Sequence, residues 1–236
     1  MACKSKVALV TRKGEIFCGG TLISKKYVLT AAQCLDRYGG AFTDFTVLLG
    51  AYSLNPKSKS SLQLGVTKMF IHPQYTHIET LEYDIAILKL NKTVKFSDSI
   101  KPPCFPRPGN NYVGEMATVS GWGQTDPESS ETTPAALMKI NLPVLSLQFC
   151  TDTLGHIQEF SSNSLCTGHS HRKSICKGDA GAPLVVFGRT RWYLLGLASF
   201  GTFCQVPGFP SYPGVFTRVD NYYEWIDSVT SDAMFC

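Results

Sequence analysis

The sequence predicts an all-β fold of two six-stranded antiparallel β-barrels packed together, with a C-terminal α-helix. Short apolar runs of strand length recur between turn residues along both halves of the chain. A proline-rich stretch, residues 101–109, separates the two series of runs. Closing each series into a barrel removes strand edges that would otherwise be open to other chains.

The elements follow in order along the chain. In the first half, strands are expected at residues 7–10, 16–23, 28–32, 45–49, 62–71 and 85–90. In the second half they are expected at residues 115–121, 137–144, 182–186, 192–200 and 214–219. A short helix is expected near residues 146–153. The clearest helix comes last, with Asp220 as its N-cap and one apolar face made of Tyr222, Trp225, Ile226 and Val229. We therefore predict a first barrel over residues 1–104, a second over 105–219 and a terminal helix over 220–236, all in one globule.

Composition excludes several classes of protein. Hydrophobic residues make up 44% and charged residues 17% of the 236 positions, which is typical of a well-cored chain and not of a disordered one. The longest apolar stretches, such as residues 193–200, are strand-sized, so no membrane span is expected. The net charge of +4 is mild, and no nucleic-acid-binding module is recognisable. Nine cysteines argue against a reducing compartment, and residues 1–4 show no signal-peptide core. We therefore expect a secreted, extracellular chain in a mature or truncated form.

Two short motifs carry the strongest functional signal. Residues 30–34 read TAAQC and residues 178–183 read GDAGAP, while Asp84 lies in the run EYDIAIL. These motifs resemble the active-site signatures of the chymotrypsin/trypsin family of serine proteases. Weaker matches follow in register at residues 17–23, 71–75, 121–123 and 213–216. The resemblance implies a trypsin-like fold, with the catalytic histidine, aspartate and serine at the positions of Gln33, Asp84 and Ala180.

Two of these three residues cannot perform the reaction. Acyl transfer needs an activated nucleophile and a base that titrates near neutral pH. The methyl group of Ala180 cannot attack a carbonyl, and the neutral amide of Gln33 does not take up a proton. Losing the nucleophile or the base of such a triad costs on the order of 10⁶ in rate. We therefore predict a proteolytically inactive homologue, a pseudoprotease, with a degenerate triad and no cofactor.

The resemblance also assigns an oxyanion loop to Gly178 and Asp179. In active members of the family, a freed N-terminal amine pairs with the aspartate of this loop, but no Ile/Val-Val-Gly-Gly tetrapeptide is present here. Because a buried, unpaired carboxylate is costly, we expect the loop to be zymogen-like or Asp179 to be paired in another way. The alternative is an exposed loop acid. Ala182 replaces a glycine of the family, and its methyl group either crowds the site or is tolerated.

By the same resemblance, a specificity pocket would have Ser174 at its base. An uncharged base favours apolar or aromatic side chains, with Ile175 narrowing the slot and Lys177 at its rim. The walls would come from Ser199, Phe200, Gly201 and Gly214. The alternative is that these residues persist only as core packing.

The resemblance implies disulfides that join Cys18 to Cys34, Cys150 to Cys166 and Cys176 to Cys204, each contributing roughly 2–4 kcal/mol. For the rest, Cys3–Cys104 is the first choice and Cys104–Cys236 the second. Either choice leaves an odd thiol, which would allow a covalently linked light chain or propeptide segment. Zinc is the competing interpretation, but there is no Cys-x-x-Cys, and the His-Ser-His of residues 169–171 is a weak signal. No metal site is expected.

Several further features bear on partners. Asn91 begins a glycosylation sequon, and the loop 50–65 contains no Asp or Glu, which argues against calcium. His72 and His77 lie near Asp84 in the sequence, but His72 fits a surface-loop motif and no serine replaces Ala180. A heparin-like polyanion is a weak candidate partner, and lysines scattered over the surface and solvated by water are the favoured interpretation. The basic residues in question are Lys4, Lys6, Lys25, Lys26, Lys57, Lys59, Lys92, Lys95 and Lys101, with residues 169–173.

Two classes of function remain. The first is a non-catalytic serine protease homologue that binds a protein partner and regulates or interferes with a proteolytic cascade of the immune, complement or clotting type, in innate immunity or immune evasion. The second is an engineered or residually active endopeptidase with an apolar P1 preference. For the first, we expect the binding surface in the loops 42–46, 57–61, 126–133 and 169–173 rather than in the cleft.

Overall fold

The apolar runs of the first half close into a six-stranded antiparallel barrel in the computed structural model, which describes residues 4–39, 42–54, 61–76, 82–106, 109–124, 134–169, 175–201 and 212–236. Its strands are β1 (Lys6–Thr11), β2 (Ile16–Leu22), β3 (Tyr27–Thr30), β4 (Phe45–Leu49), β5 (Leu62–Ile71) and β6 (Ala86–Leu90). The order around the barrel is β1-β2-β3-β6-β5-β4. Apolar side chains of all six strands fill the interior, with Val7, Leu9, Val28 and Leu88 fully buried.

The second half repeats this architecture. Its strands are β7 (Met116–Gly121), β8 (Met138–Leu145), β9 (Ser164–Thr167), β10 (Pro183–Gly188), β11 (Arg191–Gly201) and β12 (Gly214–Arg218). They close in the order β10-β11-β12-β9-β8-β7. The predicted fold class, two six-stranded antiparallel barrels with a terminal helix, is therefore confirmed. The division of the chain at residues 104 and 219 stays a prediction.

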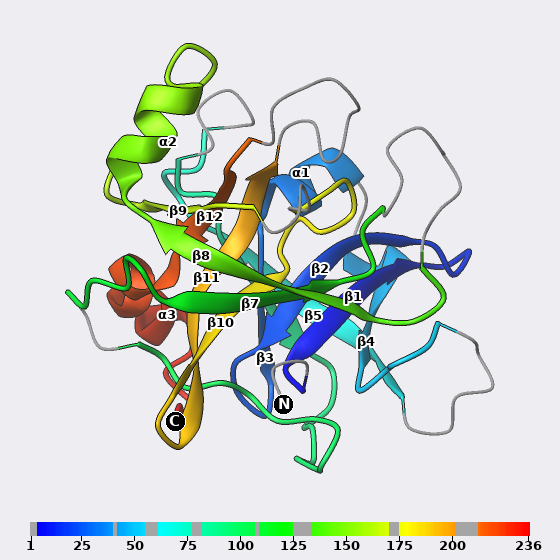
Figure 1. Ribbon diagram of the computed structural model, residues 1–236. Coiled ribbons are helices and arrows are strands. Elements are labelled where there is room, and N and C mark those ends of the chain that lie inside the picture. The colour runs from blue at the N-terminus through cyan, green and yellow to red at the C-terminus, as the bar shows by residue number, and fades with distance from the viewer. Residues whose placement is uncertain are drawn as a thin grey trace.

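The helical elements are short. They are α1 (Ala32–Tyr38), η1 (Phe42–Asp44), α2 (Leu147–Leu154), η2 (Val219–Tyr222) and α3 (Tyr223–Val229). Figure 1 shows the first barrel, in blue to cyan, beside the second, in green to orange, with α3 packed on the second barrel and α2 projecting from it. Among the described residues, no helix is long and apolar enough to cross a membrane.

The two barrels share an apolar interface. One cluster of buried side chains takes Tyr27, Leu29 and Ile87 from the first barrel. It takes Val185 and Leu197 from the second barrel, and Ile226 of α3 joins them. This cluster packs the end of β3 and the start of β6 against β11. The candidate catalytic positions Gln33 and Asp84 lie next to these strand ends, and both are hydrogen-bonded to Ser199 of β11.

Three local predictions were wrong, each for a physical reason. The run 28–32 ends as a strand at Thr30, because the chain turns into α1 at Ala32. Strand β9 was not predicted, because only Leu165 and Cys166 of its four residues are apolar. Asp220 does not cap a helix: Arg218 holds its carboxylate with bonds of 2.7 and 2.9 Å, and α3 begins only after the turn η2.

Candidate functional site

Asp84 lies two residues before the start of β6, and its carboxylate is fully buried. The residue before it, Tyr83, has a positive φ of 55°, and the chain turns inward there. The backbone N–H of Gln33 donates to Oδ1 at 2.8 Å, and the hydroxyl of Ser199 donates to Oδ2 at 2.6 Å. Burial raises the pKa of the Asp84 carboxyl above its ordinary value, and the hydrogen bonds from Gln33 and Ser199 act in the opposite direction.

Gln33 occupies the position next to this carboxylate. It lies in the first turn of α1 and is 3% exposed. Its Nε2 donates to Oδ2 of Asp84 at 2.7 Å and to the carbonyl of Ser199 at 2.6 Å. Both amide hydrogens are thereby used to join α1 of the first barrel to β11 of the second. An amide held in this way can position neighbouring groups, but it cannot accept a proton from a nucleophile.

Ala180 lies in a tight loop that packs against the same region. Gly178 and Gly181 have positive φ values of 93° and 77°, which glycine adopts without strain. The carbonyl of Ala180 accepts from the N–H of Gly19 at 2.7 Å, and its methyl group packs against the core of the first barrel. A Cβ added at Gly181 would collide with the hydroxyl of Thr30, so the loop lies directly against the segment that leads into Gln33.

Asp179 points into the protein. The N–H groups of Gly123 and Cys176 each donate to its carboxylate at 3.0 Å. Any side chain at Gly121 or Gly123 would overlap this carboxylate, which is therefore enclosed by backbone. Burial raises the pKa of Asp179, and the positive charge of Lys6 acts in the opposite direction. The alternative of an exposed loop acid does not hold, and Asp179 is paired with groups inside the protein.

Comparison with known proteins agrees with this arrangement. A family model described as Trypsin matches residues 3–226. The chain belongs to the trypsin family. It is similar to vitamin K-dependent protein C of Rattus norvegicus, with 34% identity over 93% of this chain and 47% of that protein. It is also similar to serine protease filzig of Drosophila melanogaster, with 33% identity over 90% of this chain and 12% of that protein. The chain thus spans less than half the length of these relatives.

The disulfides of this trypsin-family chain join Cys18 to Cys34 and Cys150 to Cys166. Cys104 is bonded to Cys236, so the first choice of Cys3–Cys104 was wrong. The reason lies in the path of the C-terminal segment, where Phe235 packs on Phe105 and brings the chain end beside Cys104. Cys176 is disulfide-bonded, but Cys3 and Cys204 lie outside the described residues, and the pairing Cys176–Cys204 stays a prediction.

The predicted specificity pocket is described only in part, because Ser174 lies outside the described residues. Gly201 of β11 is paired with Gly214 of β12. Ile175 is buried beside Gly201, and its carbonyl oxygen would lie 2.7 Å from a Cβ added there. Phe200 immediately precedes Gly201 on β11 and is half-buried, whereas Lys177 is exposed. Ile175 therefore fills the space beside Gly201.

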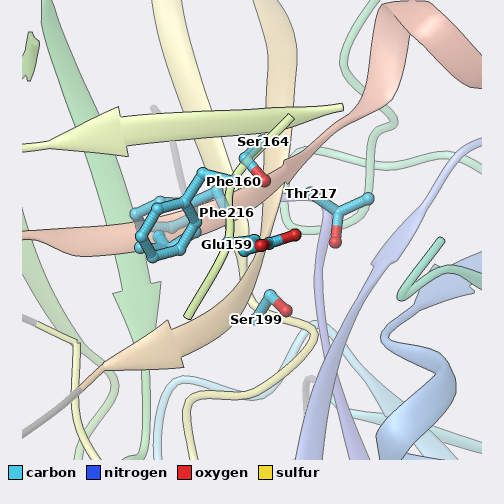
Figure 2. Close-up of a pocket in the computed structure, with 7 residues that line it drawn as sticks. Glu159, Phe160, Ser164, Ser199, Phe216 and Thr217 are labelled. Atoms are coloured by element: carbon cyan, nitrogen blue, oxygen red, sulfur yellow. The ribbon is translucent and has the colours of Figure 1, made fainter. Parts of the chain in front are cut away.

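A different pocket opens beside Ser199 (Figure 2). Figure 2 shows the carboxylate of Glu159 among Ser164, Ser199 and Thr217, and the Thr217 hydroxyl donates to the carbonyl of Asp84 at 2.8 Å. Its lining is Glu159, Phe160, Ser164, Ser199, Val215, Phe216 and Thr217, of which sequence reasoning named only Ser199. Glu159 and Phe160 belong to no motif, so no local signal pointed to them.

Other predicted residues are engaged in packing or in hydrogen bonds of their own. His72 is buried rather than at the surface, and its ring stacks on Tyr83 with 5.0 Å between centroids; burial lowers the pKa of His72. Ala182 is buried in the core of the second barrel. Asn91 is exposed, and its Oδ1 accepts from the N–H of Gly65 at 3.1 Å. The described residues contain no group of three possible metal ligands.

Several predicted partner features fall partly or wholly outside the described residues. They are His77, Lys57 and Lys59, residues 55–60 of the loop 50–65, residues 57–60 of the loop 57–61, the loop 126–133 and residues 170–173. Of the lysines proposed for a polyanion surface, Lys6 is 3% exposed and cannot take part, whereas Lys25, Lys92, Lys95 and Lys101 are exposed.

Proposed function

We propose that this chain is a secreted, non-catalytic homologue of the trypsin-family serine proteases that binds a protein partner and regulates or interferes with a proteolytic cascade. One observation carries the proposal. The Gln33 amide fills the place between Asp84 and the Ser199 carbonyl with bonds of 2.7 and 2.6 Å, in the position that a titrating base would need. At the nucleophile position, Ala180 supplies only a methyl group.

The chemistry of hydrolysis fails at two separate steps. Without a hydroxyl or thiol at residue 180, no acyl-enzyme can form, and without an imidazole at residue 33 nothing takes the proton of a nucleophile. Asp84 retains its donors, but an aspartate in this position acts only through the base that it orients. The similarity to protein C and filzig supports a protease-cascade setting, and the disulfides support secretion.

The direct test is labelling by an active-site-directed phosphonate. The chain is expected to show no serine-directed labelling and no hydrolysis of ester substrates with apolar P1 groups between pH 6 and 9. Trypsin treated in the same way is the positive control. Stoichiometric labelling of any serine in the chain would overturn the proposal and favour the alternative of a residually active endopeptidase.

A second test restores both missing groups. The double variant Gln33→His, Ala180→Ser recreates the base and the nucleophile beside Asp84, and each single variant is its control. Turnover by the double variant alone would indicate a site whose surroundings remain intact. No turnover by any of the three would indicate that the surroundings have also diverged, with the filled space beside Gly201 as the first place to examine.

The partner is approached by capture from the native extracellular fluid. The bait is the unaltered chain with its disulfides kept oxidised, since a covalently linked segment would be lost on reduction. Substitutions in the loops 42–46, 57–61, 126–133 and 169–173 are expected to weaken capture more than Ser164→Phe, which would block the pocket beside Ser199. If Ser164→Phe alone abolishes capture, the cleft is the binding site.

A further inference from the structure

Lys6 is buried, which is unusual for a lysine. It begins β1 and is 3% exposed, and no other lysine or arginine in the described ranges is buried to this extent. An ammonium group taken out of water is strongly destabilising unless an opposite charge or several acceptors face it. The environment of its Nζ therefore decides what Lys6 does.

The side chain of Lys6 passes over β2 toward the loop that carries Ala180. Lys6 pairs with Thr21 in the β1–β2 ladder, and Nζ occupies the space that a Cβ at Gly19 would fill. The same space borders the backbone N of Ala182. On its other side, Nζ lies 6.0 Å from the centre of the Trp122 ring. Because Gly19 has no side chain, the ammonium group of Lys6 in the first barrel can lie close to Ala182 of the second barrel.

The positive charge of Lys6 acts on the carboxylate of Asp179. This carboxylate is enclosed by the backbone of Gly121 and Gly123, the two neighbours of Trp122, and accepts two backbone N–H groups at 3.0 Å. Lys6 is the charged side chain whose field acts on it, whereas Lys177, close by in sequence, is exposed. Lys6, from the first barrel, therefore supplies a positive charge that acts on the carboxylate of Asp179, from the second barrel.

We propose that Lys6 is an internal counter-ion that holds Asp179, and with it the loop 178–182, in its inward position. The cation belongs to β1, so it is in place as soon as the first barrel has formed. The loop then needs no cation released by cleavage of the chain to take this shape. This inference rests on the proposed function, because it explains how the loop 178–182 of a non-catalytic homologue keeps one conformation for partner binding without proteolytic activation.

A double-mutant cycle tests the pair. Lys6→Met and Asp179→Asn each leave one buried charge alone, and each is expected to lower the melting temperature by roughly 6–20 °C. The double variant removes both charges, so its loss is expected to be clearly smaller than the sum of the two single losses. The matched control is Arg12→Met with Asp44→Asn, an exposed pair at 3.0 Å whose losses should be small and additive. Additive losses for Lys6 and Asp179 would overturn the proposal.

Hydrogen exchange locates the effect. In Lys6→Met, backbone amides of residues 175–183 should exchange at least tenfold faster than in the parent, while those of β4 and β5 should not change. Equal protection of the loop in both proteins would contradict the inference. If neither single variant folds, an experimental structure of the unaltered chain decides the question: Nζ within about 4 Å of the carboxylate supports the pair, and a separation beyond about 6 Å overturns it.

These readouts are independent of catalysis. Failure of the cycle leaves the inactive site at Gln33 and Ala180 as it is. Phosphonate labelling of the chain would overturn the proposed function without altering the coupling between Lys6 and Asp179.

Discussion

The carboxylate of Asp84 keeps a full set of donors although no imidazole faces it. Gln33 supplies a backbone N–H and an amide N–H, and Ser199 supplies a hydroxyl. Gln33 therefore donates a hydrogen bond to the Asp84 carboxylate, as a catalytic histidine would, but it cannot accept a proton. A glutamine suits this place because its two amide hydrogens match two buried acceptors, the Asp84 carboxylate and the Ser199 carbonyl.

Replacing Gln33 by alanine tests this role. Gln33→Ala removes the donor to the Ser199 carbonyl and one of the two side-chain donors to Oδ2 of Asp84, which keeps the Ser199 hydroxyl. Each lost buried hydrogen bond costs about 1–3 kcal/mol, so the free energy of unfolding should fall by roughly 2–5 kcal/mol. The matched control is Gln63→Ala, because Gln63 is exposed and donates one bond of 2.7 Å to Thr46. The control should lose less than about 1 kcal/mol. Equal losses in urea denaturation would mean that Gln33 merely fills space.

The raised pKa of Asp84 makes a second prediction, for pH dependence. Its folded-state pKa lies above the unfolded value, so the stability contributed by the protonated, buried form is complete below about pH 4 and is lost as the pH rises through the raised pKa. The side chains that contact the carboxylate, Gln33 and Ser199, carry no charge of their own.

Relative to Asp84→Asn, the parent should therefore lose stability as the pH rises from about 4 to 7. Urea denaturation at three pH values in this range measures the difference. Asp227→Asn, at an exposed position in α3, is the control for removal of a surface charge. A difference that grows in favour of the parent with rising pH would mean that the anion is the stabilised form.

At the scale of single elements, a disulfide fixes the segment that follows the C-terminal helix. The Cys104–Cys236 disulfide joins the segment between the barrels to the chain end, over a sequence separation of 132 residues. Phe235 adds ring contacts to Phe105 and Tyr223 at 5.0 and 6.5 Å. The helix is therefore attached to the second barrel from both of its ends.

Two disulfide deletions should differ in their cost. In the chain-entropy model, the long loop closed by Cys104–Cys236 is worth about 2 kcal/mol more than the loop of separation 16 closed by Cys150–Cys166. Cys104→Ala with Cys236→Ala should thus lower the free energy of unfolding more than Cys150→Ala with Cys166→Ala. Denaturant unfolding under non-reducing conditions measures both. The reverse order would show that local packing around Cys150, and not chain entropy, sets the cost.

The same scale separates what the sequence could predict from what it could not. Long runs such as β5 and β11 were found because many of their residues are apolar, while β9 has only two apolar residues, Leu165 and Cys166. Motifs located Gln33, Asp84 and Ala180, since these residues stand in short segments of fixed spacing. Lys6 could not be recognised, because a lysine before an apolar run has the same local pattern whether it is buried or exposed. Its burial depends on Gly19 and Asp179, which other parts of the chain supply.

At the scale of the molecule, the site exists only where the barrels meet. Gln33 comes from the first barrel, and Ser199 and the loop 178–182 come from the second. Contacts that cross the join include the bond from Gln33 to the Ser199 carbonyl, the bond from Gly19 to Ala180 and the apolar cluster around Leu29 and Leu197. Because both barrels contribute to one cluster, neither can expose its share of it without a large loss.

The two barrels should therefore unfold in a single transition. Leu197→Ala opens a cavity in the shared cluster, and a fully buried leucine replaced in this way costs about 2–5 kcal/mol. Hydrogen exchange in mild denaturant should show faster opening of β1–β6 and of β7–β12 to the same extent, although residue 197 belongs to the second barrel alone. Met138→Ala, at a half-exposed position of β8, should change neither. If Leu197→Ala accelerates exchange only in the second barrel, the barrels are independent units, and a chain divided near residue 104 would be able to fold as two pieces.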